Sequence, residues 1–169
     1  MLARTSHMRT AVVSLIHCIY ASRAIATHRE AEIEALLARA RLKNAAQGIT
    51  GMLLLIEDSF FQVLEGDAPC VDSTYDVISH DSRHDRVTQI IREPIAKRSF
   101  GDWSMGFASV ERAAARQLVD ENDFFGNASC LECISPGRAK KLLLAFRAGR
   151  WRTEVTGMHR AHARVGQPR

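Results

Sequence analysis

The sequence has no long apolar run, and its aromatic content is low. Aromatic residues make up 7% of the 169 residues, hydrophobic residues 46% and charged residues 25%. Because no apolar stretch approaches the roughly 20 residues that a membrane-spanning helix needs, the sequence argues against an integral membrane protein. The hydrophobic and charged fractions exclude a mostly disordered chain, and the length suits about one globular domain.

Cysteine is also scarce, which bears on disulfides and metals. The four cysteines are Cys18, Cys70, Cys130 and Cys133. The last two form a C-L-E-C pair, which supplies at most half of a four-ligand zinc site. His159 and His162 follow, but their spacing is tighter than that of the usual zinc pattern. We therefore expect no metal, and reduced thiols rather than the disulfide framework of a secreted protein.

The patterns of common enzyme classes are missing as well. Residues 48–51, G-I-T-G, are too short for either glycine-rich phosphate-binding fingerprint. No Ser–His–Asp spacing and no pair of catalytic carboxylates stands out. We therefore do not expect an enzyme.

The net charge of +4 is unevenly distributed along the chain. Residues 138–169 carry nine Lys or Arg side chains and one acid, Glu154, so the remainder of the chain is mildly acidic. We interpret residues 150–169 as a basic, flexible tail. The alternative is a docking segment for an acidic partner, RNA or an anionic lipid.

The N-terminal region has the outline of a secretory signal peptide. Arg4 and Arg9 precede the apolar residues 11–20, and small residues follow them. Ser14 and His17 interrupt the apolar run, however, and its Val, Ile and Tyr content suits a buried strand. We therefore expect a cytoplasmic protein with a flexible lead-in over residues 1–9 and a first strand over residues 10–20.

The hydrophobic periodicity predicts the order β-α-β-β-α-β-β. Residues 27–30 fit a capping box, and apolar residues at helical spacing extend the first helix to about residue 43. Residues 49–56 and 60–65 predict an antiparallel hairpin, and a helix with Pro69 in its first turn follows. Residues 86–95 and 103–110 predict two more strands. The order is typical of an α+β, ferredoxin-like sheet with two helices on one face, and residues 111–122 and 136–149 predict additional C-terminal helices.

Three polar side chains fall where the pattern predicts a core. Gln62 lies between Phe61 and Val63 in a strand, Tyr20 ends the first strand, and Asn44 ends the first helix. A buried amide needs partners for its carbonyl and its two N–H groups. A phenol and two amides suit a planar heterocycle with amide-like edges, whereas a satisfied core glutamine is the alternative for Gln62.

Six segments, taken in order, resemble the BLUF family of blue-light sensors that use a flavin. They include F-F-Q-V-L-E-G over residues 60–66, a downstream R-H, and W-S-M over residues 103–105. The other matching segments are residues 20–24, Asn44 with residues 48–53, and residues 94–100, with the R-H inside residues 81–84. The resemblance covers about residues 10–110, which we therefore expect to form the flavin-binding domain, with residues 111–149 as a helical cap.

The resemblance implies a role for individual residues. The photoactive tyrosine falls on Tyr20, the switching glutamine on Gln62, and the amide that holds the flavin edge on Asn44. The pair that relays the signal falls on Trp103 and Met105, and their spacing within a predicted strand places both on one face. The remaining implied flavin contacts are Leu36, Ala40, Leu53, Ile78, Asp81, Arg83 and His84. Relatives often carry Asn or His at position 43, where this chain has Lys.

The implied function is a blue-light photoreceptor that signals to a partner protein of unknown identity, through the last strand and the C-terminal helices. Electron and proton transfer from Tyr20 and rearrangement of Gln62 red-shift the flavin. The implied cofactor is FAD, with FMN or riboflavin as alternatives, and we expect a homo-oligomer. Two other functions stay open from the residues alone. One is a small ferredoxin-like hydrolase using Arg23 and Asn44. The other is an RNA-binding module using the basic tail, although aromatic RNA-stacking positions are missing.

Overall fold

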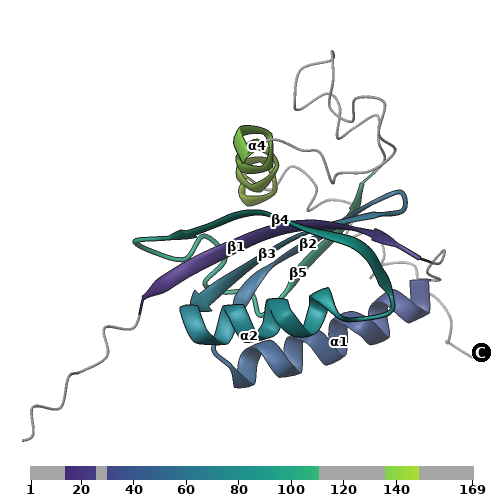
Figure 1. The fold of residues 1–169 in the computed structure, drawn as a ribbon, viewed down its shortest axis with the longest axis horizontal. Coiled ribbons are helices and arrows are strands. Elements are labelled where there is room, and N and C mark those ends of the chain that lie inside the picture. Colours follow the sequence, from purple (N-terminus) through teal and green to yellow (C-terminus); the bar gives the residue numbers. More distant parts are fainter. Residues whose placement is uncertain (1–13, 26–29, 111–135, 149–169) are drawn as a thin grey trace, which may run out of the picture.

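The computed structural model describes residues 14–25, 30–110 and 136–148 (Figure 1). The strands are β1 (Leu15–Ala24), β2 (Thr50–Ile56), β3 (Ser59–Asp67), β4 (His84–Pro94) and β5 (Gly106–Val110). The helices are α1 (Glu30–Ala46), α2 (Ala68–Ser79) and α4 (Pro136–Arg147). None of the described helices is long and apolar enough to cross a membrane.

The strands form one sheet in the order β4-β1-β3-β2-β5. β1 pairs antiparallel with β3 and β4, β2 pairs antiparallel with β3, and β5 joins the edge parallel to β2. The helices α1 and α2 lie side by side on one face of the sheet, and α4 crosses the opposite face (Figure 1). The predicted ferredoxin-like α+β fold is confirmed.

The sheet separates two hydrophobic cores. Towards α4, the buried strand residues include Ile19, Leu54 and Phe61, which form one cluster with Leu142 and Phe146 of that helix. Towards α1 and α2, a second cluster contains the side chains of the alternate strand positions. Its members include Ile16, Cys18, Tyr20, Leu53, Phe60 and Leu64. Because successive strand residues point to opposite faces, β1 and β3 are buried almost throughout.

The last strand begins later than the sequence predicts. β5 starts at Gly106 rather than at residue 103, because the chain turns just before it. The backbone N–H of Trp103 donates to the carbonyl of Phe100, and the N–H of Gly51 donates to the carbonyl of Trp103. Trp103 and Met105 therefore lie in a turn segment ahead of the strand and not within it.

Smaller differences concern the element ends. β1 runs on to Ala24, β4 begins at His84, and α1 continues to Ala46. The predicted turn residue Ser59 belongs to β3, and the two-residue turn before it has Glu57 at a positive φ of 54°. The predicted capping box, the helix over residues 111–122, the C-L-E-C pair and the basic tail over residues 150–169 lie outside the described residues.

Candidate functional site

A cavity of about 410 Å³ lies between α1 and α2 above the sheet. Its walls are largely apolar, and two buried amide side chains, Asn44 and Gln62, lie among its lining residues. Eight predicted flavin contacts and one predicted relay residue, Met105, are among its lining residues; the eight are Leu36, Ala40, Asn44, Leu53, Gln62, Ile78, Asp81 and Arg83. This volume falls within the range of small-molecule sites, as does the combination of apolar walls with a few polar groups.

The cavity meets a buried hydrogen bond between two neighbouring strands. Tyr20 of β1 and Gln62 of β3 are direct partners in the antiparallel register. Their side chains therefore share a face, and the Tyr20 hydroxyl donates to Oε1 of Gln62. The pairing of β1 with β4 shifts register between Ile19 and Tyr20, which adds a residue in β4 at this point. Bulges of this kind change the direction of nearby side chains and are common next to functional sites.

The Gln62 amide has a second partner on its other side. Its Nε2 donates to Sδ of Met105 at 3.5 Å. A thioether sulfur accepts hydrogen bonds weakly and cannot donate one, so the amide N–H group belongs on the Met105 side. The carbonyl oxygen then faces Tyr20. The two partners together define one orientation of an amide that could otherwise rotate.

Burial keeps Tyr20 in its neutral form. The side chain is fully buried, and this desolvation raises the pKa of Tyr20 well above its usual value. The ring of Tyr75 from α2 meets the Tyr20 ring edge-on, with the ring centroids 5.4 Å apart. Tyr20 therefore remains a hydrogen-bond donor at neutral pH, and its ring is held by packing.

Asn44 links the cavity to residues 103–105, the segment before β5. It lies near the end of α1, is 4% exposed, and donates from Nδ2 to the carbonyl of Ser104 at 2.9 Å. One N–H and the amide oxygen of Asn44 remain available to a ligand. Asn44 can therefore contact a bound molecule and the Ser104 backbone at the same time.

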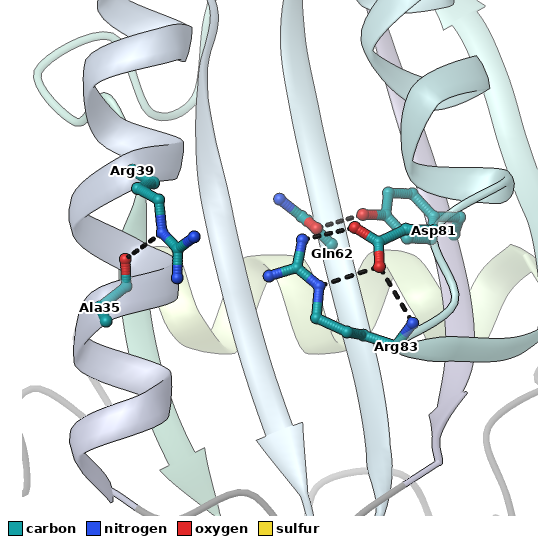
Figure 2. A network of polar contacts seen from close by, with 6 residues as sticks. Ala35, Arg39, Gln62, Asp81 and Arg83 are labelled. Atoms are coloured by element: carbon teal, nitrogen blue, oxygen red, sulfur yellow. Dashed lines mark hydrogen bonds and ion pairs between the residues drawn. The ribbon is translucent and has the colours of Figure 1, made fainter.

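Charged groups from both helical sides line the outer part of the cavity (Figure 2). Arg83, in the turn after α2, donates from its backbone N–H and from its guanidinium group to the carboxylate of Asp81. This pairing raises the pKa of Arg83. Figure 2 shows Arg39 on the other helix, α1, where it donates to the carbonyl of Ala35. Lys43 also lines the cavity.

Three predicted site residues, Tyr20, His84 and Trp103, are not among the residues that line the cavity, although Tyr20 donates a hydrogen bond to Gln62, which does line it. His84 begins β4, where its backbone pairs with Ala24, and its side chain is outside the description. Arg23, which the hydrolase interpretation needed beside Asn44, pairs instead with Asp85.

Trp103 and Met105 lie on opposite sides of the sheet, so the predicted shared face is wrong. Met105 is 3% exposed and packs in the cluster beneath α1 and α2. Trp103 packs instead on Phe100 and on Phe146 of α4, with ring centroids 6.1 Å and 5.5 Å away. The turn before β5 breaks the alternation on which the expectation rested. It also makes one short segment contact both the cavity and α4.

Two residues that hold this segment were missed as functional candidates. Glu65 of β3 is fully buried, and its carboxylate accepts the backbone N–H groups of Ser99 and Phe100 at 2.9 Å. Arg98 donates to the carbonyls of Glu65 and Gly48. A charged residue at an inward strand position was the available signal for Glu65, because such a residue is retained only with partners.

The fold and this cavity define a ferredoxin-like domain with a ligand slot between its two helices. Residues 15–106 match the family model for BLUF, described as sensors of blue-light using FAD. The chain therefore belongs to the BLUF family, as the resemblance implied.

Relatives of this chain include larger light-regulated proteins. It is 32% identical over 114 residues to the photoactivated adenylate cyclase subunit beta of Euglena gracilis, which covers 67% of this chain and 13% of that one. It is 32% identical over 74 residues to the blue light- and temperature-regulated antirepressor BluF of Escherichia coli (strain K12), covering 44% and 18%. The chain thus spans less than a fifth of either curated relative.

A solved structure of similar size is also related. The dark-state structure of BlrB, a BLUF protein, is 29% identical, with a TM-score of 0.65. The match covers 80% of this chain and 97% of that one.

The residues present fit the family's cofactor, FAD. Apolar side chains from both helices and from β2, among them Leu36, Leu53 and Ile78, suit the two faces of a flat ring system. Asn44 and Gln62 offer the N–H and C=O groups that the amide-like edge of a flavin ring requires. Arg39 and Lys43 provide positive charge among the lining residues for the phosphates.

Proposed function

We propose that Tyr20 and Gln62 are the photoactive pair of this blue-light sensor, and that Asn44 holds the edge of the flavin. The supporting observation is the buried hydrogen bond from Tyr20 to Gln62, whose amide lines an apolar slot between two helices. Leu36, Ala40, Leu53 and Ile78 would contact the ring, and Asp81 and Arg83 would close the slot beside it. His84 remains a candidate contact from the family pattern alone.

Bound in the slot, FAD supplies the absorption of blue light and an acceptor for one electron. Tyr20 gives up an electron and its hydroxyl proton, and Oε1 of Gln62 is the group placed to receive that proton. When Tyr20 regains its electron, Oε1 of Gln62 gives the proton back to the Tyr20 oxygen, so both side chains end neutral. Gln62 is left rearranged, because the hydrogen bond that fixed its orientation was broken in between. A changed hydrogen bond from the Gln62 amide to the bound flavin would account for the red shift.

The signal leaves through the segment before β5. When the Gln62 amide turns, its N–H group loses Met105 as a partner, and a weak hydrogen bond to sulfur is worth about 0.5 kcal/mol, the lower end of the usual range. That amount suffices to bias a segment with two arrangements of similar free energy. Trp103, two residues away, packs on Phe146, so the displacement reaches α4. We propose that α4 and the rest of residues 111–149 pass it to a separate effector protein or a second copy of the chain.

A dark and a blue-lit absorption spectrum of the FAD-loaded chain test the photoactive pair. Tyr20→Phe and Gln62→Leu should bind FAD and lose the red shift. Tyr75→Phe is the matched control, because it removes the hydroxyl of the tyrosine that packs edge-on against Tyr20, and it should keep the shift. A normal shift in Tyr20→Phe would refute the proposed donor.

A further inference from the structure

The backbone of the segment before β5 is held by two side chains of α1. Nε of Arg41 donates to the carbonyl of Met105 at 3.0 Å, and Nδ2 of Asn44 donates to the carbonyl of Ser104 at 2.9 Å. Residues three apart lie on one side of a helix, so both donors reach neighbouring carbonyls from the same face of α1. The residue that follows Met105, Gly106, is the first to pair with β2.

We infer that Arg41 is a positioning residue that sets where the Met105 side chain lies against Gln62. The inference rests on the proposed function, in which Met105 senses the Gln62 amide. The hydrogen bond of Arg41 goes to the Met105 backbone and not to its side chain, yet fixing that carbonyl fixes the direction in which the side chain leaves the chain. A hydrogen bond from a guanidinium group is stronger than one between neutral groups, so Arg41 is the stronger of the two anchors.

The two anchors differ in their relation to the ligand. Asn44 lines the cavity, and a bound flavin would draw on its remaining amide groups. Arg41 is exposed and is not among the residues that line the cavity. It therefore holds Met105 whether or not the slot is occupied, and replacing it leaves the walls of the slot unchanged. This separation allows an effect on Met105 to be measured apart from flavin binding.

The test follows the Met105 methyl group by NMR in the full chain labelled at its methionine methyls, in the dark, with and without FAD. The Met105→Leu variant identifies the signal among the five methionines. Arg41→Met keeps the unbranched stem and removes the donor. We expect it to move the ratio between two Met105 positions about tenfold toward the displaced one, equivalent to ~1.4 kcal/mol. Arg41→Lys, which restores a cationic donor, should reverse at least part of this change.

Glu34→Gln serves as the control on an exposed position of the same helix, and it should leave the Met105 signal as in the unmodified chain. An unchanged Met105 signal in Arg41→Met would overturn the inference. So would an equal change in Arg41→Met, Arg41→Lys and Glu34→Gln, since that would show general loosening of α1. The absorption spectrum tests the proposed function separately. We expect a light-induced red shift in the unmodified chain and in all three variants, whatever the Met105 signal shows. If the unmodified chain showed no red shift, the proposed function itself would be refuted.

Discussion

The two faces of the sheet have the same strand architecture but bury different chemistry. The face beneath α4 buries mainly aliphatic and aromatic side chains, such as Leu54, Phe61 and Leu142, together with the Glu65 carboxylate. The face beneath α1 and α2 buries a phenol and two amides next to a cavity. Neighbouring residues of one strand, Phe61 and Gln62, belong to these two environments.

This difference suggests that the two faces have different roles, with the α4 face contributing stability and the other face holding the polar groups of the cavity. Apolar side chains buried without a cavity contribute free energy of unfolding through their contacts and their removal from water. Buried amides contribute little net stability, and an unpaired buried polar group costs about 1–3 kcal/mol. The phenol and the two amides on the face beneath α1 and α2 are therefore best explained by the ligand that we propose for the cavity. The opposite face provides a rigid support for them.

The largest expected effect comes from truncating an aromatic residue on the α4 face. Phe61→Ala should lower the free energy of unfolding by about 3–5 kcal/mol, because it removes a fully buried ring from a closely packed core. Leu36→Ala, on the half-buried cavity wall, should cost about 1 kcal/mol or less without FAD. Urea unfolding with and without FAD measures both.

The cofactor should sharpen this contrast between the faces. Saturating FAD stabilises the unmodified chain by about 2.7 kcal/mol at a hundredfold excess over Kd, and Leu36→Ala should lose part of that gain through weaker binding. If Leu36→Ala and Phe61→Ala lowered the free energy of unfolding equally in the FAD-free protein, the proposed difference between the cavity face and the α4 face would be contradicted.

Much of this arrangement could be predicted from local patterns. Alternation in β3 predicted Gln62 on a core face, and helical spacing placed Asn44 at the end of α1. Tyr20 and Gln62 are cross-strand neighbours because of the register between β1 and β3, which the element order suggested without fixing it. The pattern already suggested that these three polar groups share a site for a planar heterocycle, and the resemblance to a family then gave each of them a role.

The parts that could not be predicted depend on contacts between distant segments. Trp103 and Met105 fit a strand pattern, but the residues before them are held in a turn by Glu65 and Arg98. The Glu65 carboxylate makes its contacts with this turn from more than thirty positions earlier in the chain. Arg41 carries a charge on an exposed helix position, which is typical of a solvated face. Its bond to the Met105 carbonyl becomes visible only in the folded structure.

A smaller effect is expected at Gly106, where the two faces are connected. A Cβ atom there would lie 2.6 Å from Cε3 of Trp103 and 3.3 Å from Cε1 of Phe146. Gly106→Ala should therefore displace the indole from α4 and cost about 1–3 kcal/mol. Trp103 fluorescence in a Trp151→Phe background should shift as the indole moves. Gly137→Ala is the control, because the added methyl group meets no atom within 4 Å among the described residues outside its own stretch of helix. A similar fluorescence change in both variants would contradict the steric explanation.

The smallest effect is electrostatic and concerns how α4 is attached. Nζ of Lys140 lies 2.8 Å from the Glu93 carboxylate, and this contact, with a smaller contribution from His17, lowers the pKa of Glu93 below its ordinary value of 4.5. A lowered pKa in the folded state contributes stability above the ordinary value, and this contribution disappears as the pH falls through the folded-state pKa. Both groups are partly exposed, so the contribution is small. Lys140→Met should therefore lower the free energy of unfolding slightly at about pH 7, and less at an acidic pH below the folded-state pKa of Glu93. An equal loss at both pH values would show that Lys140 stabilises α4 through packing of its stem rather than through Glu93.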